Sequence, residues 1–290
     1  MPLRLYSCET LVSLRLQFVG FHDFEFVSLP NLKIMHLDDN LYADDLVLEK
    51  LISSCLVLED LTIVRNVDET VKVLRVRSNT LNSLKLVLDS SKSWYIDDSD
   101  DWEVLIDAPR LTYLSLEDDQ SVSFGIRSLG SAAKVEIAVS FNVNDIWDLD
   151  ESTERNSSVG KLLNGLSSVR DMTISGTTLK IICQYMNLER VPHFHNMTRL
   201  ETKFYMTDLE LLPEFLESCP NLQSLVLKLK GVTCKKETSF SSMPKCLQSS
   251  LEYVEMTRPN CEPIIVAEVM SFGKCNSSCK VNVVRLENES

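Results

Sequence analysis

The 290-residue sequence has few glycines and no long apolar run, and both shortages narrow the possible folds. Only 8 glycines are present, so long flexible linkers between separate domains are not expected. No apolar stretch reaches the roughly 18 residues that a membrane-spanning helix needs, and the first residues, Met1-Pro2-Leu3-Arg4, do not form a signal peptide. The nine cysteines, an odd number, are expected to be free thiols of a reducing compartment. The sequence therefore predicts a protein of the cytosol, the nucleus or both.

Basic residues are also scarce. Lys and Arg total 29 against 42 Asp and Glu, which gives a net charge of −13. Nucleic-acid binding needs a basic stripe that displaces counterions, and anionic membrane surfaces repel an acidic protein, so neither partner is expected. The acidic runs at 97–101 and 148–151 are predicted to be solvated loops, with a docking patch for a basic partner as the alternative. Trp94, Trp102 and Trp147 lie beside these runs and are expected to pack beneath the loops, or alternatively to anchor an interface.

Motifs of catalysis and metal binding are missing. The sequence has no Gly-x-Gly-x-x-Gly or phosphate-binding loop and no Gly-x-Ser-x-Gly elbow. His193 and His195, with Cys183 nearby in sequence, offer two ligands on one predicted strand face, but a metal site needs three or four converging ligands. Cys275 and Cys279 have no second pair at finger-like spacing. The sequence predicts a non-enzymatic protein without a metal or another cofactor.

The strongest positive feature is a recurring phrase, Leu-x-x-Leu-x-Leu. Clear copies begin at Leu11, Leu81, Leu111 and Leu222. Together with weaker copies, the phrase begins at residues 11, 32, 58, 81, 111, 132, 169, 197, 222 and 251. The steps of 21 to 37 residues match leucine-rich repeats of roughly 20–29 residues with some insertions. Because each repeat packs only on its neighbours, we expect one α/β leucine-rich-repeat solenoid, a horseshoe with a parallel concave sheet and a helical or irregular convex side.

The alternation within the phrase predicts which side chains are available to a partner. Successive side chains of a strand point to opposite faces, so the leucines enter the core and the intervening residues line an open face. That face is polar and mixed in charge, which suits protein recognition. The predicted partner-binding residues are Arg15, Gln17, His36, Asp38, Asp60, Thr62, Lys85, Tyr113, Glu117, Asp171, Thr173 and Lys228. The same alternation predicts that Ser115 and Val226 are exposed.

Helices are expected between some of the strands. Residues 42–52 and 208–218 carry apolar side chains at helical spacing, and the first begins with two acids that favour a helix start. Both end in Ser-Cys, and Cys55 and Cys219 are expected to be buried structural thiols rather than reactive ones. The stretch 140–164 is expected to be irregular, with a mobile insertion in its polar part.

Phrases around the repeats resemble a plant family. Residues 8–16, CETLVSLRL, resemble the C-x-T-L-V-x-L-x-L opening of the repeats in plant F-box proteins. Residues 29–38 resemble their LP-x-LK-x-LHLD, and residues 54–63 resemble their GCPVLEDL-x-I. Residues 243–255 resemble the VP-x-CL-x-SSL-x-x-V start of the FBD module. The sequence is thus similar, from residue 5 to about 257, to F-box/FBD/leucine-rich-repeat proteins.

The resemblance implies a domain organisation and a function. It implies repeats over residues 1–238 and an FBD-like module over 239–290, degenerate after about 257, with residues 280–286 as a closing strand. In that family an F-box binds the Skp adaptor of an SCF-type ubiquitin ligase, and the repeats present a protein substrate. We therefore expect a non-catalytic module equivalent to the substrate-recognition part of such a ligase.

No F-box precedes the repeats in this sequence. A Skp-type adaptor and a cullin are therefore expected as partners only if a longer form carries an F-box. The alternative is a truncated or non-functional member, a decoy or gene remnant, that is unable to join the ligase.

Overall fold

The computed structural model of the chain forms two compact units. It describes residues 7–22, 26–65, 71–88, 102–127, 129–130, 133–142, 153–205, 211–230, 244–258 and 279–285. Unit 1 comprises Met1–Lys134 and Val139–Leu166, and unit 2 comprises Val135–Ala138 and Ser167–Ser290. The boundary predicted at 238/239 lies outside the described residues, so the FBD-like module stays a prediction.

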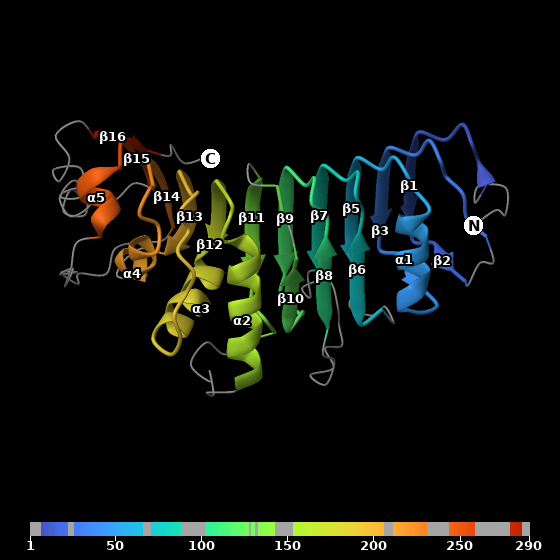
Figure 1. Ribbon diagram of the computed structural model, residues 1–290, viewed down its shortest axis with the longest axis horizontal. Coiled ribbons are helices and arrows are strands. Elements are labelled where there is room, and N and C mark those ends of the chain that lie inside the picture. The colour runs from blue at the N-terminus through green and yellow to red at the C-terminus, as the bar shows by residue number, and fades with distance from the viewer. Residues whose placement is uncertain are drawn as a thin grey trace. The chain divides into compact units, whose positions relative to one another are not determined.

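Unit 1 contains a parallel sheet built from the leucine phrases (Figure 1). Its strands lie side by side in the order β1 (Ser13–Gln17), β3 (Ile34–Asp38), β5 (Asp60–Arg65), β7 (Ser83–Leu88) and β9 (Tyr113–Asp118). Backbone hydrogen bonds at the start of the strands also link successive repeats. The carbonyl of Val12, just before β1, accepts hydrogen bonds from the N–H groups of Lys33 and Ile34, just before and at the start of β3. After the first phrase, the first leucine of each phrase in unit 1 is buried beneath these turns, as at Leu32 and Leu81, so the phrase supplies both the strand and its core.

A buried asparagine joins the first two repeats of unit 1. Asn40 donates from Nδ2 to the Leu16 carbonyl (3.1 Å) and accepts from the Val19 N–H at Oδ1 (2.8 Å). It thereby satisfies two part-buried backbone groups of the first repeat. The short strands β2 (Gly20–Phe21) and β4 (Leu41–Tyr42) pair beside it.

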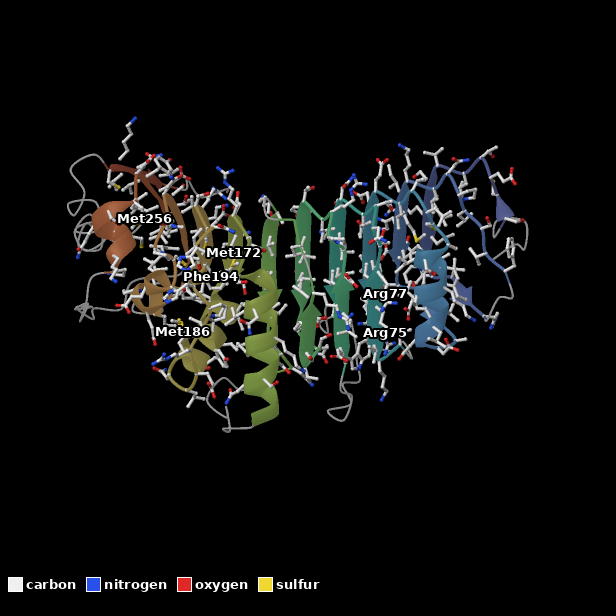
Figure 2. The ribbon with its side chains drawn as sticks, viewed as in Figure 1. Arg75, Arg77, Met172, Met186, Phe194 and Met256 are labelled. Atoms are coloured by element: carbon white, nitrogen blue, oxygen red, sulfur yellow. The ribbon has the colours of Figure 1, made fainter. Side chains whose placement is uncertain are left out.

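The return segments of unit 1 include a second parallel sheet. Its strands are β6 (Val73–Arg77), β8 (Glu103–Asp107) and β10 (Ser123–Ile126), with β8 in the middle. The prediction of a helical or irregular return side did not include this sheet. The physical reason is visible in β6 and β8, where burial alternates along the strand as it does in a strand with one packed face. Figure 2 shows Arg75 and Arg77 on β6, and Arg77 lies 3.9 Å from the Glu49 carboxylate and 4.0 Å from that of Asp107.

Helix α1 (Asp45–Ser53) confirms the helix predicted over residues 42–52. Asp44 caps it, because its carboxylate accepts from the N–H groups of Leu46 and Val47. The buried side chains follow helical spacing and are those of Val47, Leu48, Leu51 and Ile52.

Helix α2 (Thr153–Leu166) contradicts the prediction that residues 140–164 are irregular. Its buried hydrophobic residues, Val159, Leu162, Leu163 and Leu166, are spaced by three, one and three, which places them on one helical face. The polar residues of the first turns masked this pattern in the sequence. The helix packs on β10 within unit 1.

Unit 2 continues the leucine phrases with helices on its return segments (Figure 1). Its parallel strands lie in the order β12 (Asp171–Ser175), β13 (Arg199–Tyr205), β14 (Ser224–Lys230), β15 (Tyr253–Arg258) and β16 (Lys280–Arg285). Its helices are α3 (Gly176–Met186), α4 (Leu212–Glu217) and α5 (Lys245–Ser249). Strand β16 confirms the predicted closing strand, and α4 confirms the second predicted helix within its described residues. Buried Met172 on β12, Met256 on β15 and Phe194 between α3 and β13 are labelled in Figure 2.

The predicted repeat starts agree with the observed strands throughout. Including β11 (Lys134–Val139), ten strands begin two residues after the first position of a predicted phrase. This agreement, and the parallel pairing within each unit, establish the leucine-rich-repeat fold.

The two Ser-Cys corners have the same local structure in both units. Cys55 donates from Sγ to the Leu51 carbonyl (3.3 Å), and Cys219 donates to the Phe215 carbonyl (3.6 Å). Burial raises the pKa of Cys55 to about 11 and that of Cys219 to about 12. Because the thiolate is the reactive form, both residues are structural thiols, as predicted.

Candidate protein-binding face

The open face of unit 1 consists of the side chains of β1, β3, β5, β7 and β9 that point away from the leucine core. Strand register arranges them in rows. One row contains Arg15, His36, Thr62, Lys85 and Ser115, and the next contains Gln17, Asp38, Val64, Val87 and Glu117. The structure therefore brings seven of the predicted residues, those of β1 to β9 other than Asp60 and Tyr113, into two adjacent rows, while Asp60 and Tyr113 share the preceding row.

Most of the predicted face residues are exposed or half-buried. Arg15, Gln17, Lys85 and Glu117 are exposed, whereas His36, Asp38, Asp60, Thr62, Tyr113, Asp171 and Lys228 are half-buried. Thr173 is only 9 % exposed, and Ser115 and Val226 are also buried, which corrects the expectation for these three. They are short side chains in the middle of their strands, and neighbouring strands only about 4.8 Å away carry longer side chains that cover them.

The open face of unit 2, formed by β12 to β16, carries a chain of ion pairs. Arg199 Nη1 lies 3.1 Å from Asp171 Oδ1, and Arg199 Nη2 lies 2.9 Å from Glu201 Oε2. The second carboxylate oxygen of Glu201 pairs with Lys228 Nζ. Three neighbouring strands are thus connected by alternating charges. Register places Asp171 beside Arg199, and Glu201 beside Val226, two residues before Lys228 on the same face of β14.

Within this network Glu201 is less exposed than its partners. The Glu201 side chain is 11 % exposed, whereas those of Arg199 and Lys228 are 35 % and 44 % exposed. Burial acts to raise the pKa of Glu201, but hydrogen bonds from Lys228 and Arg199 and their charges outweigh it, so the pKa is lowered. Glu201 therefore stays ionised and holds the two cations in place.

Two charged side chains, Arg65 and Asp118, are buried inside unit 1. The guanidinium of buried Arg65 lies over the Trp102 ring, 4.5 Å from its centroid, and donates from Nη2 to the Val71 carbonyl. Buried Asp118 accepts hydrogen bonds from the Ser121 N–H (2.7 Å) and hydroxyl (2.7 Å). Burial raises the pKa of Asp118, although the Ser121 hydrogen bonds and the Arg65 charge act to lower it. This cluster stabilises the fold and confirms that Trp102 belongs to the core; Trp94 and Trp147 lie outside the described residues.

Several of the face residues were not found from the sequence. Arg199, Glu201, Lys203 and Tyr205 lie on β13, whose phrase is a weak copy because methionine replaces its first leucine. The alternation of polar and apolar residues after Leu200 was the available signal.

The histidine and cysteine candidates for a metal site do not converge in the structure. His193 and His195 lie in an irregular segment before β13 rather than on a strand, with ring centroids 5.4 Å apart. Cys183 is buried and donates to the Leu211 carbonyl (3.4 Å). Across the described ranges, no group of three or more His, Cys, Asp or Glu side chains is arranged to hold a metal ion. Cys275 and the acidic runs at 97–101 and 148–151 lie outside those ranges.

No helix within the described part of the chain has the length and apolar character required to cross a membrane.

Comparisons with known proteins agree with the repeat architecture. Residues 1–144 match the family model for the leucine-rich repeats of FBD-associated F-box protein At5g56370. The chain is 60 % identical over 322 residues to F-box/FBD/LRR-repeat protein At5g22660 of Arabidopsis thaliana, covering 99 % of this chain and 71 % of that protein.

Two further Arabidopsis thaliana relatives have the same kind of name. F-box/FBD/LRR-repeat protein At5g22700 is 61 % identical over 277 residues, which cover 95 % of this chain and 63 % of the relative. F-box/FBD/LRR-repeat protein At2g26030 is 39 % identical over 304 residues, which cover all of this chain and 66 % of the relative. The chain thus spans about two thirds of the length of these relatives. No solved structure matches it. Its repeats, their strand register and these identities place the chain in the family of F-box/FBD/LRR-repeat proteins.

Proposed function

We propose that the chain is a non-catalytic protein-binding module that holds a protein substrate on the open faces of its parallel sheets. The observation that carries this proposal is the composition of those faces. Ordered rows of Arg, Lys, Asp, Glu, His and Tyr side chains stand on a rigid sheet, away from the leucine core. Rigidly placed polar and aromatic side chains of this kind give specificity at protein interfaces.

The family membership supports a more specific role, that of the substrate-recognition part of an SCF-type ubiquitin ligase. In this role the open faces select the substrate, and a Skp-type adaptor and a cullin are recruited by an F-box in a longer form of the protein. The FBD-like module over residues 239–290 is proposed to close the end of the repeats. A protein working with such a ligase acts in the cytosol, the nucleus or both.

The test of substrate holding is comparative affinity purification from plant extract with quantitative mass spectrometry. The bait is the 290-residue chain, and the matched bait carries Arg15→Glu with Lys85→Glu on the open face of unit 1. Both side chains are exposed, so the substitutions are expected to leave the fold intact, which circular dichroism checks. We expect a small set of proteins retained by the first bait and lost from the second.

Two identical sets of retained proteins, or none above a bead control, would contradict substrate holding. The ligase role is tested separately, by asking whether a Skp-type adaptor co-purifies with the tagged product of the native gene. If no adaptor co-purifies but the substrates are still retained, the chain is a binding module that works outside the ligase.

A further inference from the structure

The open face of unit 2 covers Glu201 more than the two cations that it binds. In the chain Asp171–Arg199–Glu201–Lys228 the charges sum to zero, and Asp171 is 30 % exposed, close to the value for Arg199. The two basic side chains are 35 % and 44 % exposed, while Glu201 is 11 % exposed. A molecule that approaches Glu201 therefore meets the guanidinium of Arg199 and the ammonium of Lys228 first.

A further cation and an aromatic ring extend this surface. Lys203 lies on β13 beside Lys228 of β14, is exposed, and takes part in no ion pair found within the described residues. Tyr205 follows on the same face of β13 and is 59 % exposed. Tyrosine beside arginine and lysine is a composition enriched at protein interfaces.

The neighbouring acids on the face are also engaged. Asp171 is held by Arg199, and Glu255 accepts a hydrogen bond from the Tyr253 hydroxyl. We call Arg199, Lys203, Tyr205 and Lys228 the basic patch. Its three cations outnumber Glu201, the carboxylate bound between two of them, and Lys203 supplies a cation on a chain whose net charge is −13.

We propose that the basic patch binds an acidic segment, rich in Asp and Glu, of a partner protein. Arg199 and Lys203 are separated by four residues of one strand, about 13 Å, so the patch engages several carboxylates of one extended segment rather than a single ion. Glu201 fixes Arg199 and Lys228 before binding, which lowers the conformational cost of the encounter. The inference rests on the proposed function, since it specifies the chemistry of the substrate that the sheet holds.

The test measures fluorescence anisotropy of labelled probes with the full 290-residue chain at about 50 mM and about 300 mM salt. The probes are a peptide of about eight residues with alternating Glu and Ser, long enough to span the patch, the same peptide with Gln for Glu, and a single-stranded oligonucleotide of equal charge. The test variant is Lys203→Gln with Lys228→Gln. The matched control is Arg190→Gln with Lys245→Gln, which removes the same charge from exposed positions of unit 2 outside its sheet.

We expect the Glu peptide to bind about tenfold more tightly than the Gln peptide at low salt, and to lose that advantage at high salt. The test variant should weaken Glu-peptide binding about tenfold, and the control less than about twofold. Lys203→Gln alone, which breaks no ion pair of the network, should weaken it about threefold.

Equal weakening by the test and control variants, or equal binding of the two peptides, overturns the proposal. Tighter binding of the oligonucleotide than of the Glu peptide also overturns it, in favour of a nucleic-acid partner. The outcome is separable from that of the proposed function. Cellular proteins retained by the wild-type chain, lost from the Arg15→Glu, Lys85→Glu bait and unaffected by the Lys203→Gln, Lys228→Gln variant would leave substrate holding intact and remove only the acidic-segment assignment.

Discussion

The two units share one repeated strand but place their charges differently. In unit 1 the guanidinium of Arg65 is buried against Trp102, and buried Asp118 is bound by the turn at Ser121. In unit 2 the charged groups form a network on the open face, with Arg199 and Lys228 partly exposed. The leucine positions determine the core and are alike in both units, so the residues between and after them decide whether a charge stabilises the fold or faces a partner.

The return segments differ in the same way. Unit 1 returns through β6, β8 and β10, which form a sheet of their own, as well as through α1 and α2, whereas the described helices of the unit 2 returns are α3, α4 and α5. Apolar residues at every second position favour a strand, whereas apolar residues at a period of 3.6 favour a helix. A common core strand therefore tolerates either return, because repeats need only bury their apolar side against the next repeat.

The largest effect is expected from removing the buried cation of unit 1. Arg65→Met keeps most of the side-chain volume against Trp102 but leaves Asp118 without the positive charge that lowers its pKa. Leaving a buried charge without compensation typically costs about 3–5 kcal/mol. We expect about 3 kcal/mol from urea unfolding at neutral pH, because the substitution also removes the hydrogen bond to the Val71 carbonyl. The cost should shrink as the pH falls through the raised pKa of Asp118, since protonation removes the uncompensated charge.

Arg199→Met in unit 2 is the matched comparison for this first prediction. Its guanidinium is partly exposed, so water replaces the lost partners and the cost should be only about 1 kcal/mol. Equal costs for the two substitutions would remove the distinction between buried and face charges.

The second-largest effect is expected where α2 packs on the return sheet of unit 1. A Cβ added at Gly165 would lie 2.6 Å from the Ile126 carbonyl oxygen and 2.7 Å from the Ile126 Cβ, and neither atom can move without the strand. Gly165→Ala should therefore destabilise the protein by about 2 kcal/mol, despite its higher helix propensity. Gly20→Ala is the control, since nothing lies within 4 Å of its added Cβ, and we expect a change within about 0.5 kcal/mol. Thermal unfolding of both variants measures the difference, and a neutral Gly165→Ala would show that α2 does not contact β10 this closely.

The sequence predicts the core strands well because the leucine positions of each phrase determine which side chains face the core. Leu81, Leu84 and Leu86 all enter the core, and a shift by one residue would expose all of them. The same logic located the Ser-Cys corner at Cys55, where a small apolar side chain fits beneath the turn.

The return segments and the face network were harder to predict, for two physical reasons. Helix α2 buries only a stripe that begins at Val159, so its polar first turns resemble a loop. The Arg199–Glu201–Lys228 network joins two strands, and ion pairing between repeats depends on the register of both. A single phrase read alone contains no information about the charge on its neighbour.

Acid titration should distinguish Glu201 on the open face from buried Asp118, because the two carboxylates change the stability of the protein with pH in opposite directions. The lowered pKa of Glu201 means that its contribution to stability is complete above about pH 4.5 and is lost as the pH falls through its folded-state pKa. Glu201→Gln should therefore cost about 1 kcal/mol at pH 7 and almost nothing near pH 3.

For Asp118 the pKa is raised from 3.8, so its contribution to stability is complete below that pH and is lost as the pH rises through the folded-state pKa. The stability of Asp118→Asn relative to wild type should therefore increase with pH over that window, and urea unfolding from pH 3 to 7 checks both slopes. Parallel slopes for the two variants would contradict the assignment.

The smallest effect is expected from an exposed ion pair of unit 1 that has nearly the same geometry as those of the unit 2 network. Lys33 Nζ lies 2.8 Å from Glu59 Oε1, but the side chains are 51 % and 47 % exposed. A double-mutant cycle of Lys33→Ala and Glu59→Ala should give a coupling of about 0.3 kcal/mol, and the cycle of Arg199→Ala and Glu201→Ala, with its better-covered carboxylate, about 1 kcal/mol. Raising the salt concentration to about 1 M should abolish the first coupling and reduce the second only partly, since screening acts mainly on solvent-exposed charges. Equal couplings would mean that Glu201 does not hold Arg199 in place before a partner arrives, and the basic patch would then be ordered by binding rather than prepared for it.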